Sequence, residues 1–99
     1  MRNIKSVELI PFPDSDIQQN FTFDAIAEEG SFSFKFRWFN ERWNCWVTTP
    51  EGDIRQIGVY PNVISGSGHL DYGFVFITDM TAIDYSSLFL TELYLILWE

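Results

Sequence analysis

The sequence predicts a small all-β fold: an antiparallel meander that closes into a barrel or a compact sandwich of about six to seven strands, with at most one short helical turn. From residue 31 to residue 38 every even position is aromatic and every odd position is polar or charged. Alternate side chains of a strand point to opposite faces, so this pattern gives one apolar and one polar face. A helix would scatter the same aromatic rings around its axis. The composition agrees, because 18% of the residues are aromatic and such residues favour strands.

Length and charge narrow the class of protein. A chain of 99 residues is one domain over residues 1–99, with room for a single core. A net charge of -8 disfavours nucleic acid as a ligand. The single Cys45 excludes an internal disulfide and a cysteine-based zinc site. No apolar stretch approaches the roughly 18 residues of a membrane span, so we expect a soluble, untargeted chain without membrane insertion.

The first strands follow from alternation and turn residues. Residues 4–10 predict a short edge strand that ends at Pro11 and Pro13, because proline cannot donate to a sheet. Residues 20–27 resume the alternation and predict a second strand, which a turn ending at Gly30 joins to residues 31–38. Keeping the apolar faces together sets the register of this hairpin. The predicted pairs are Ala25 with Phe32, Phe23 with Phe34, and Phe21 with Phe36.

The next two turns extend the meander. A turn at residues 39–42 pairs Trp38 with Trp43, Phe36 with Cys45, and Phe34 with Val47, which places Cys45 in the core. The same register lays Trp46 across from Lys35 on the opposite face, where a cation can lie over the indole ring. Residues 50–53 then predict a turn before a strand over residues 54–60, in which Ile57 and Val59 are expected to meet Val47 and Cys45.

The last third of the sequence is less regular. Residues 61–73 predict a surface loop with Val63, Ile64 and Leu70 as anchors to the core, and residues 74–79 predict a strand. Residues 80–89 predict a loop in which Asp84 can cap one helical turn through Ser87. The final strand, residues 90–98, is apolar on both faces. Such a strand is either covered on both sides or faces a partner chain. The candidate subunit-interface residues are Trp46, Tyr94, Ile96 and Trp98.

Possible catalytic or metal-binding groups fit ordinary structural roles better. Ser67, His69 and Asp71 include the residue types of a hydrolytic triad, but they alternate within one glycine-containing loop. The glycines of residues 65–68 lack the lysine and helix of a phosphate-binding loop. The carboxylate pairs Asp79 with Asp84 and Asp14 with Asp16 match no calcium loop. We therefore predict no enzyme activity, no catalytic residues, no metal site and no cofactor.

Several short landmarks occur in a characteristic order along nearly the whole chain. They are Ile10-Pro11-Phe12, Gln19-Asn20-Phe21, Phe36-Arg37-Trp38, the turn and tryptophan at residues 40–43, Pro50-Glu51-Gly52-Asp53, Ile57-Gly58-Val59 and Leu93-Tyr94-Leu95. In this order and spacing they resemble the small baseplate plug family of contractile-tailed bacteriophages and prophages.

This resemblance implies a structural virion protein of a contractile tail. Such a protein would pack in the baseplate around the hub and tail tube, beside other baseplate, tube or sheath-associated proteins in a symmetric assembly. It would be made in the host cytoplasm and would have neither catalysis nor cofactor. Two alternatives remain open from the residues. A stand-alone binding module would capture a peptide or glycan through a sheet edge or Trp46, and a small hydrolase would depend on His69.

Overall fold

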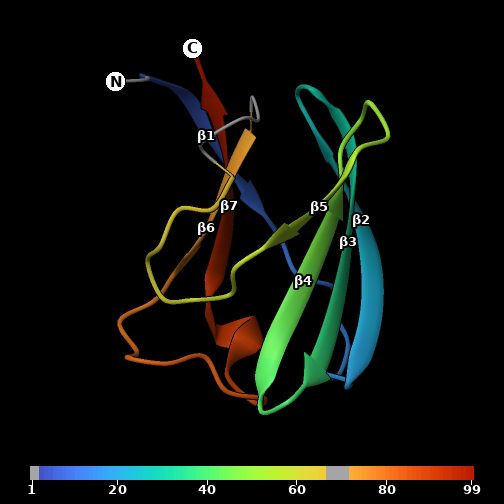
Figure 1. The fold of residues 1–99 in the computed structure, drawn as a ribbon, viewed down its shortest axis with the longest axis vertical. Coiled ribbons are helices and arrows are strands. Elements are labelled where there is room, and N and C mark those ends of the chain that lie inside the picture. The colour runs from blue at the N-terminus through green and yellow to red at the C-terminus, as the bar shows by residue number, and fades with distance from the viewer. Residues whose placement is uncertain (1–2, 67–71) are drawn as a thin grey trace.

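The computed structural model describes residues 3–66 and 72–99, in which seven strands form two antiparallel sheets packed face to face (Figure 1). One sheet has the strand order β1-β7-β6 and the other has the order β2-β3-β4-β5. The sheets do not close into a barrel, so the sandwich form of the prediction is confirmed. The strands are β1 (Ile4–Ile10), β2 (Asn20–Ala27), β3 (Gly30–Phe39), β4 (Arg42–Thr48), β5 (Ile54–Ile57), β6 (Tyr72–Ile77) and β7 (Glu92–Trp98).

The larger sheet is the predicted meander. Its first two hairpins have the expected register, and the direct partners are Ala25 with Phe32, Phe23 with Phe34, Phe21 with Phe36, Trp38 with Trp43, Phe36 with Cys45, and Phe34 with Val47. The register follows the apolar pattern because a slip of one residue would move every aromatic ring to the solvent face.

The register of β5 differs from the prediction. Cys45 pairs with Ile57, and Val47 pairs with Arg55 instead of Ile57. The turn explains the difference, because the hydroxyl of Thr49 accepts a hydrogen bond from the main-chain N–H of Asp53 at 3.2 Å. The turn therefore begins at Thr49, and Ile54 pairs with Thr48 instead of Pro50. The strand also stops at Ile57 rather than at residue 60.

In the smaller sheet, β7 lies between β1 and β6, and β1 is the edge strand that its sequence predicted. Strand β6 begins and ends two residues earlier than expected. Its outer edge bonds to the chain between Pro61 and Ser65, and the main-chain N–H groups of Asn62 and Ser65 donate to Phe76 and Phe74. The predicted anchors Val63 and Ile64 are about half exposed and do not enter the core. The predicted anchor Leu70 lies outside the described residues.

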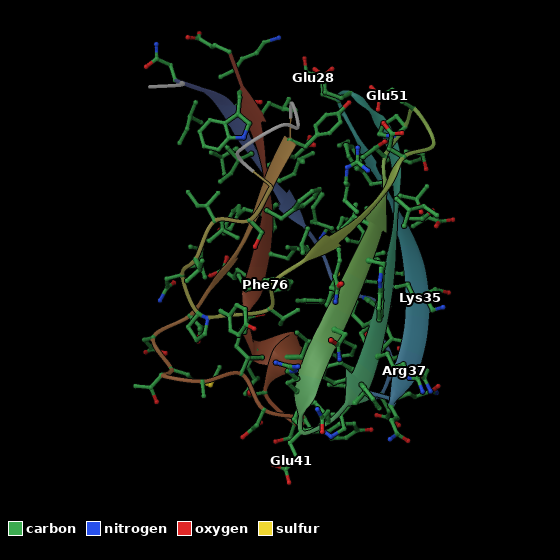
Figure 2. The ribbon with its side chains drawn as sticks, in the orientation of Figure 1. Glu28, Lys35, Arg37, Glu41, Glu51 and Phe76 are labelled. Atoms are coloured by element: carbon green, nitrogen blue, oxygen red, sulfur yellow. The ribbon has the colours of Figure 1, made fainter. Side chains whose placement is uncertain are left out.

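The core lies between the two sheets and is largely aromatic. Phe34 and Phe36 of β3 are buried and meet Phe74 and Phe76 of β6 edge to face, with ring centroids 5.9 and 6.1 Å apart. Phe76 is labelled in Figure 2. This geometry places the positive edge of one ring against the negative face of the other. The alternating stripe of β3 is therefore the centre of the core.

The loop between β6 and β7 contains the predicted capped turn. The Asp84 carboxylate accepts hydrogen bonds from the main-chain N–H groups of Ser86 and Ser87, and the Ser87 hydroxyl accepts one from the N–H of Asp84. This reciprocal arrangement is a capping box. A short 3-10 helix, η1 (Leu88–Leu90), follows it. Hydrogen bonds from Ser87 and then Ser86 hold the pKa of the Asp84 carboxyl below its ordinary value.

Candidate interaction surfaces

The outer face of the smaller sheet is apolar. Val7 pairs with Ile96, and Leu9 pairs with Tyr94, so these four side chains share the face that points away from the larger sheet. Val75 of β6 pairs with Tyr94 from the other side and belongs to the same face. We call these five residues the apolar outer face. In most antiparallel sandwiches this face is polar, so its composition needs a reason.

Two residues of β1 form the exposed part of the apolar outer face. Val7 is 53% exposed and Leu9 is 49% exposed, whereas Val75 and Ile96 are buried. Tyr94 is half-buried, and its hydroxyl donates to the Glu92 carboxylate at 2.8 Å. That hydrogen bond is the main reason why the pKa of Tyr94 is raised. The apolar outer face therefore has a covered centre and an open strip along β1.

Trp98 extends the apolar outer face towards the end of β7. A Cβ atom built on Gly73 would lie 3.1 Å from the indole Nε1 of Trp98 and 3.4 Å from Cγ2 of Ile64. Glycine at this position of β6 therefore allows the indole to lie across the neighbouring strand. The close approach fixes Trp98 as part of the same surface.

The structure divides the four predicted interface residues between two surfaces. Tyr94, Ile96 and Trp98 share the apolar outer face, as the alternation of β7 predicted, but Ile96 is 3% exposed and offers a partner little area. Trp46 lies on the outer face of the larger sheet, because its partners Lys35 and Gln56 are there. One continuous patch of these four residues is therefore absent from the described chain.

The surface around Trp46 is polar and cationic. The Lys35 ammonium lies 5.9 Å from the centroid of the Trp46 ring, and the Arg37 guanidinium lies 5.2 Å from that of Phe39. Both basic residues are on the side of their sheet that faces away from β1, β7 and β6 (Figure 2). A shallow groove of about 370 Å³ crosses this face, lined by Thr22, Ser33, Phe34, Lys35, Trp46, Thr48 and Ile54. Hydroxyls, a cation and a ring together can bind a polar chain.

Sequence reasoning missed Val7 and Leu9 as surface residues. The available signal was that residues 4–10 carry apolar side chains at both odd and even positions. In a strand, this places Ile10 on one face and Val7 and Leu9 on the other. Ile10 is buried, so the two others must point outward. Only the pairing of β1 with β7 places them beside Tyr94 and Ile96.

The groups considered for catalysis and metal binding lie partly outside the described residues. Ser67, His69 and Asp71 lie outside those residues, as does the second half of the glycine-containing segment 65–68. The Asp84 carboxylate caps its own turn. Residues 3–66 and 72–99 contain no group of three or more His, Cys, Asp or Glu side chains that could hold a metal ion. Cys45 is fully buried, and burial raises the pKa of its thiol far above the ordinary value.

No helix in the described part of the chain is long and apolar enough to cross a membrane. Comparisons with protein-family models, curated proteins and solved structures find no match to this chain.

Proposed function

We propose that this protein is a non-catalytic structural component of a contractile phage tail, which packs in the baseplate through its apolar outer face. The exposed strip of that face is the observation that carries the proposal, because Val7 and Leu9 lie in the part of β1 that pairs residue by residue with β7 and still leave about half of each side chain open to solvent. Exposed apolar patches of this kind are typical of protein–protein contacts. The order of landmarks that resembles the baseplate plug family supplies the identity of the neighbours.

Burial against a neighbour would use the apolar area that the fold leaves open. Covering the exposed half of Val7 and of Leu9 would contribute roughly 1 kcal/mol each. Tyr94 and Trp98 would add flat side chains of the type enriched in interface cores. A partner would therefore lie over β1 and β7.

The test is co-purification of the tagged chain from cells that produce the particle. We expect tail tube, hub or sheath-associated proteins to be identified with it by mass spectrometry. Leu9→Lys should reduce their recovery about tenfold or more, because it places a charge in the contact. Ile54→Lys is the matched control, since Ile54 is exposed on an edge strand of the other sheet and the charge change is the same.

Two outcomes would contradict the proposal. One is a wild-type chain that recovers no tail protein. The other is equal recovery by wild type and by a folded Leu9→Lys chain, which would exclude the apolar outer face as the contact. Circular dichroism of both variants distinguishes a lost contact from a lost fold.

The groove beside Trp46 supports a second candidate function, a binding module for a peptide or glycan. The cation over the indole ring and the hydroxyls of Thr22, Ser33 and Thr48 favour a polar ligand. This function predicts a monomer whose Lys35 and Trp46 signals shift when the ligand is added in NMR titrations. Leu9→Lys would leave those shifts unchanged.

A further inference from the structure

Strand β2 forms an open edge of the larger sheet. It pairs along its full length with β3, without a break in register. In the described chain, no hydrogen bond joins the main chain of residues 20–27 to any segment other than β3. Its other side therefore carries a row of unpaired main-chain groups, which is a template for another strand.

The hydrogen bond between Gln19 and Trp38 identifies the groups that point outward. The N–H of Trp38 donates to the carbonyl of Gln19 at 2.7 Å, and this pair continues the β2–β3 register by one position beyond Asn20 and Arg37. Direct partners that are hydrogen-bonded alternate with partners that are not. The main-chain groups of odd-numbered residues in β2 therefore bond to β3. The N–H and C=O groups that point away belong to Asn20, Thr22, Asp24 and Ile26.

The other sheet edges carry protection that β2 lacks. Strand β1 has a register break between Ile4 and Ser6, and its Glu8 carboxylate accepts a hydrogen bond from the main-chain N–H of Glu28. The chain near Ser65 covers β6, and β5 is only four residues long. Bulges, inward charges, short strands and covering loops are the usual means of blocking an edge. Among the described strands, β2 is the long edge without any of them.

The side chains of β2 also leave apolar area at this edge. Phe21, Phe23 and Ala25 are only partly buried, whereas their partners on β3 are at most 1% exposed. Ile26, on the other face, is 89% exposed. A strand added at this edge would cover the apolar side chains on both faces of β2.

We propose that β2 pairs with β2 of a second copy of this chain. The two strands run antiparallel about a two-fold axis beside Phe23, so that Thr22 of each copy pairs with Asp24 of the other. Asn20 then pairs with Ile26. The outward main-chain groups meet, the Phe23 rings lie side by side, and the two larger sheets become continuous.

Other registers of the antiparallel β2–β2 pair are less favourable. An axis beside Asp24 would place two carboxylates opposite each other, which is unfavourable. An axis beside Thr22 would leave Ile26 without a partner. A shift by one residue would put apolar side chains against polar ones. Because each copy carries a net charge of -8, added salt should tighten the contact by screening repulsion.

This contact is independent of the proposed function, because the apolar outer face belongs to the other sheet. Sedimentation equilibrium of the purified full chain at increasing concentration should show a monomer–dimer equilibrium. Thr22→Pro should weaken it about tenfold or more, since proline removes an outward N–H and leaves the β2–β3 bonds in place. Thr22→Val keeps that N–H and should dimerise like wild type.

Amide hydrogen exchange on the wild-type chain locates the contact and does not depend on the folding of a variant. The amides of Thr22, Asp24 and Ile26 should gain protection as concentration rises. A chain that stays monomeric to about 1 mM would overturn the proposal. So would a dimer in which these amides remain unprotected, because that dimer would use another surface.

Discussion

The indole Nε1 of Trp43 donates a hydrogen bond to the main-chain carbonyl of Asp84 at 3.0 Å and so joins β4 to the loop between β6 and β7. The Trp43 ring also stacks on Tyr85, with centroids 5.5 Å apart and planes 13° apart, and Trp38 meets both rings edge to face. The capping box at Asp84 holds that carbonyl in place. One residue of the meander therefore fixes the segment that leads into β7.

Removing this hydrogen bond should destabilise the protein. Trp43→Phe keeps an aromatic ring but removes the shortest hydrogen bond to the Asp84 carbonyl, which then accepts only from the N–H and the hydroxyl of Ser87, both at 3.4 Å. We expect this loss to cost about 1–3 kcal/mol. Chemical denaturation followed by circular dichroism measures the change in the free energy of unfolding. Trp46→Phe is the control, because Trp46 lies on the outer face, and its effect should stay within about 0.5 kcal/mol. Equal losses in the two variants would contradict the role of the Trp43–Asp84 bond.

Glycine at position 41 of the β3–β4 turn should make the protein more stable than the natural Glu41 does. Asn40 and Glu41 both have a φ of 61°, as a two-residue type I′ turn requires, and Glu41 is at the hairpin tip in Figure 2. A side chain in that conformation costs about 1–2 kcal/mol, partly offset by the greater freedom of glycine in the unfolded chain. Glu41→Gly should therefore raise the free energy of unfolding by about 0.5–1 kcal/mol.

Glu29→Gly is the matched control for the turn. It makes the same change of charge in the other hairpin, but Glu29 does not have a positive φ. Glycine there gains no conformational relief and should be neutral or destabilising. Thermal unfolding of the two variants side by side measures the difference. Stabilisation by both substitutions would point to the loss of negative charge instead of turn geometry.

The Tyr72 hydroxyl donates a hydrogen bond to the Glu51 carboxylate at 2.8 Å and is the main cause of the lowered pKa of Glu51. A folded-state pKa below the unfolded one stabilises the protein above the unfolded-state pKa. This contribution is lost as the pH falls through the folded-state pKa. Tyr72→Phe should therefore raise the pKa of Glu51 and reduce stability at pH 7 more than at pH 3.

Carboxyl carbon chemical shifts measured by NMR across this pH range give the Glu51 pKa directly. Tyr60→Phe is the control, because Tyr60 is exposed and does not contact Glu51 in the described hydrogen bonds. An unchanged Glu51 pKa in Tyr72→Phe would mean that the main-chain hydrogen bond and Thr49 hold the carboxylate without help from Tyr72.

The sequence predicted the meander because its pattern is local. Alternation between residues 20 and 47, with short turns between strands, leaves only one register that keeps the aromatic rings on one face. The same reasoning placed Cys45 in the core and Lys35 beside Trp46. The β5 register was missed because it depends on the hydrogen bonds that close the turn between Thr49 and Asp53, among them one that the Thr49 hydroxyl accepts, and no hydrophobic pattern encodes them.

By itself, the sequence determined the fold class, the bounds of β1 and β2 and the two apolar faces of β7, because these depend on neighbouring residues. Only the tertiary structure decided that β7 lies between β1 and β6, that Val7 and Leu9 join its outer face, and that Trp46 is on the other sheet. It also left β2 as an open edge. Strand order between distant segments is set by how two sheets pack, and alternation within a strand carries no information about its distant neighbour.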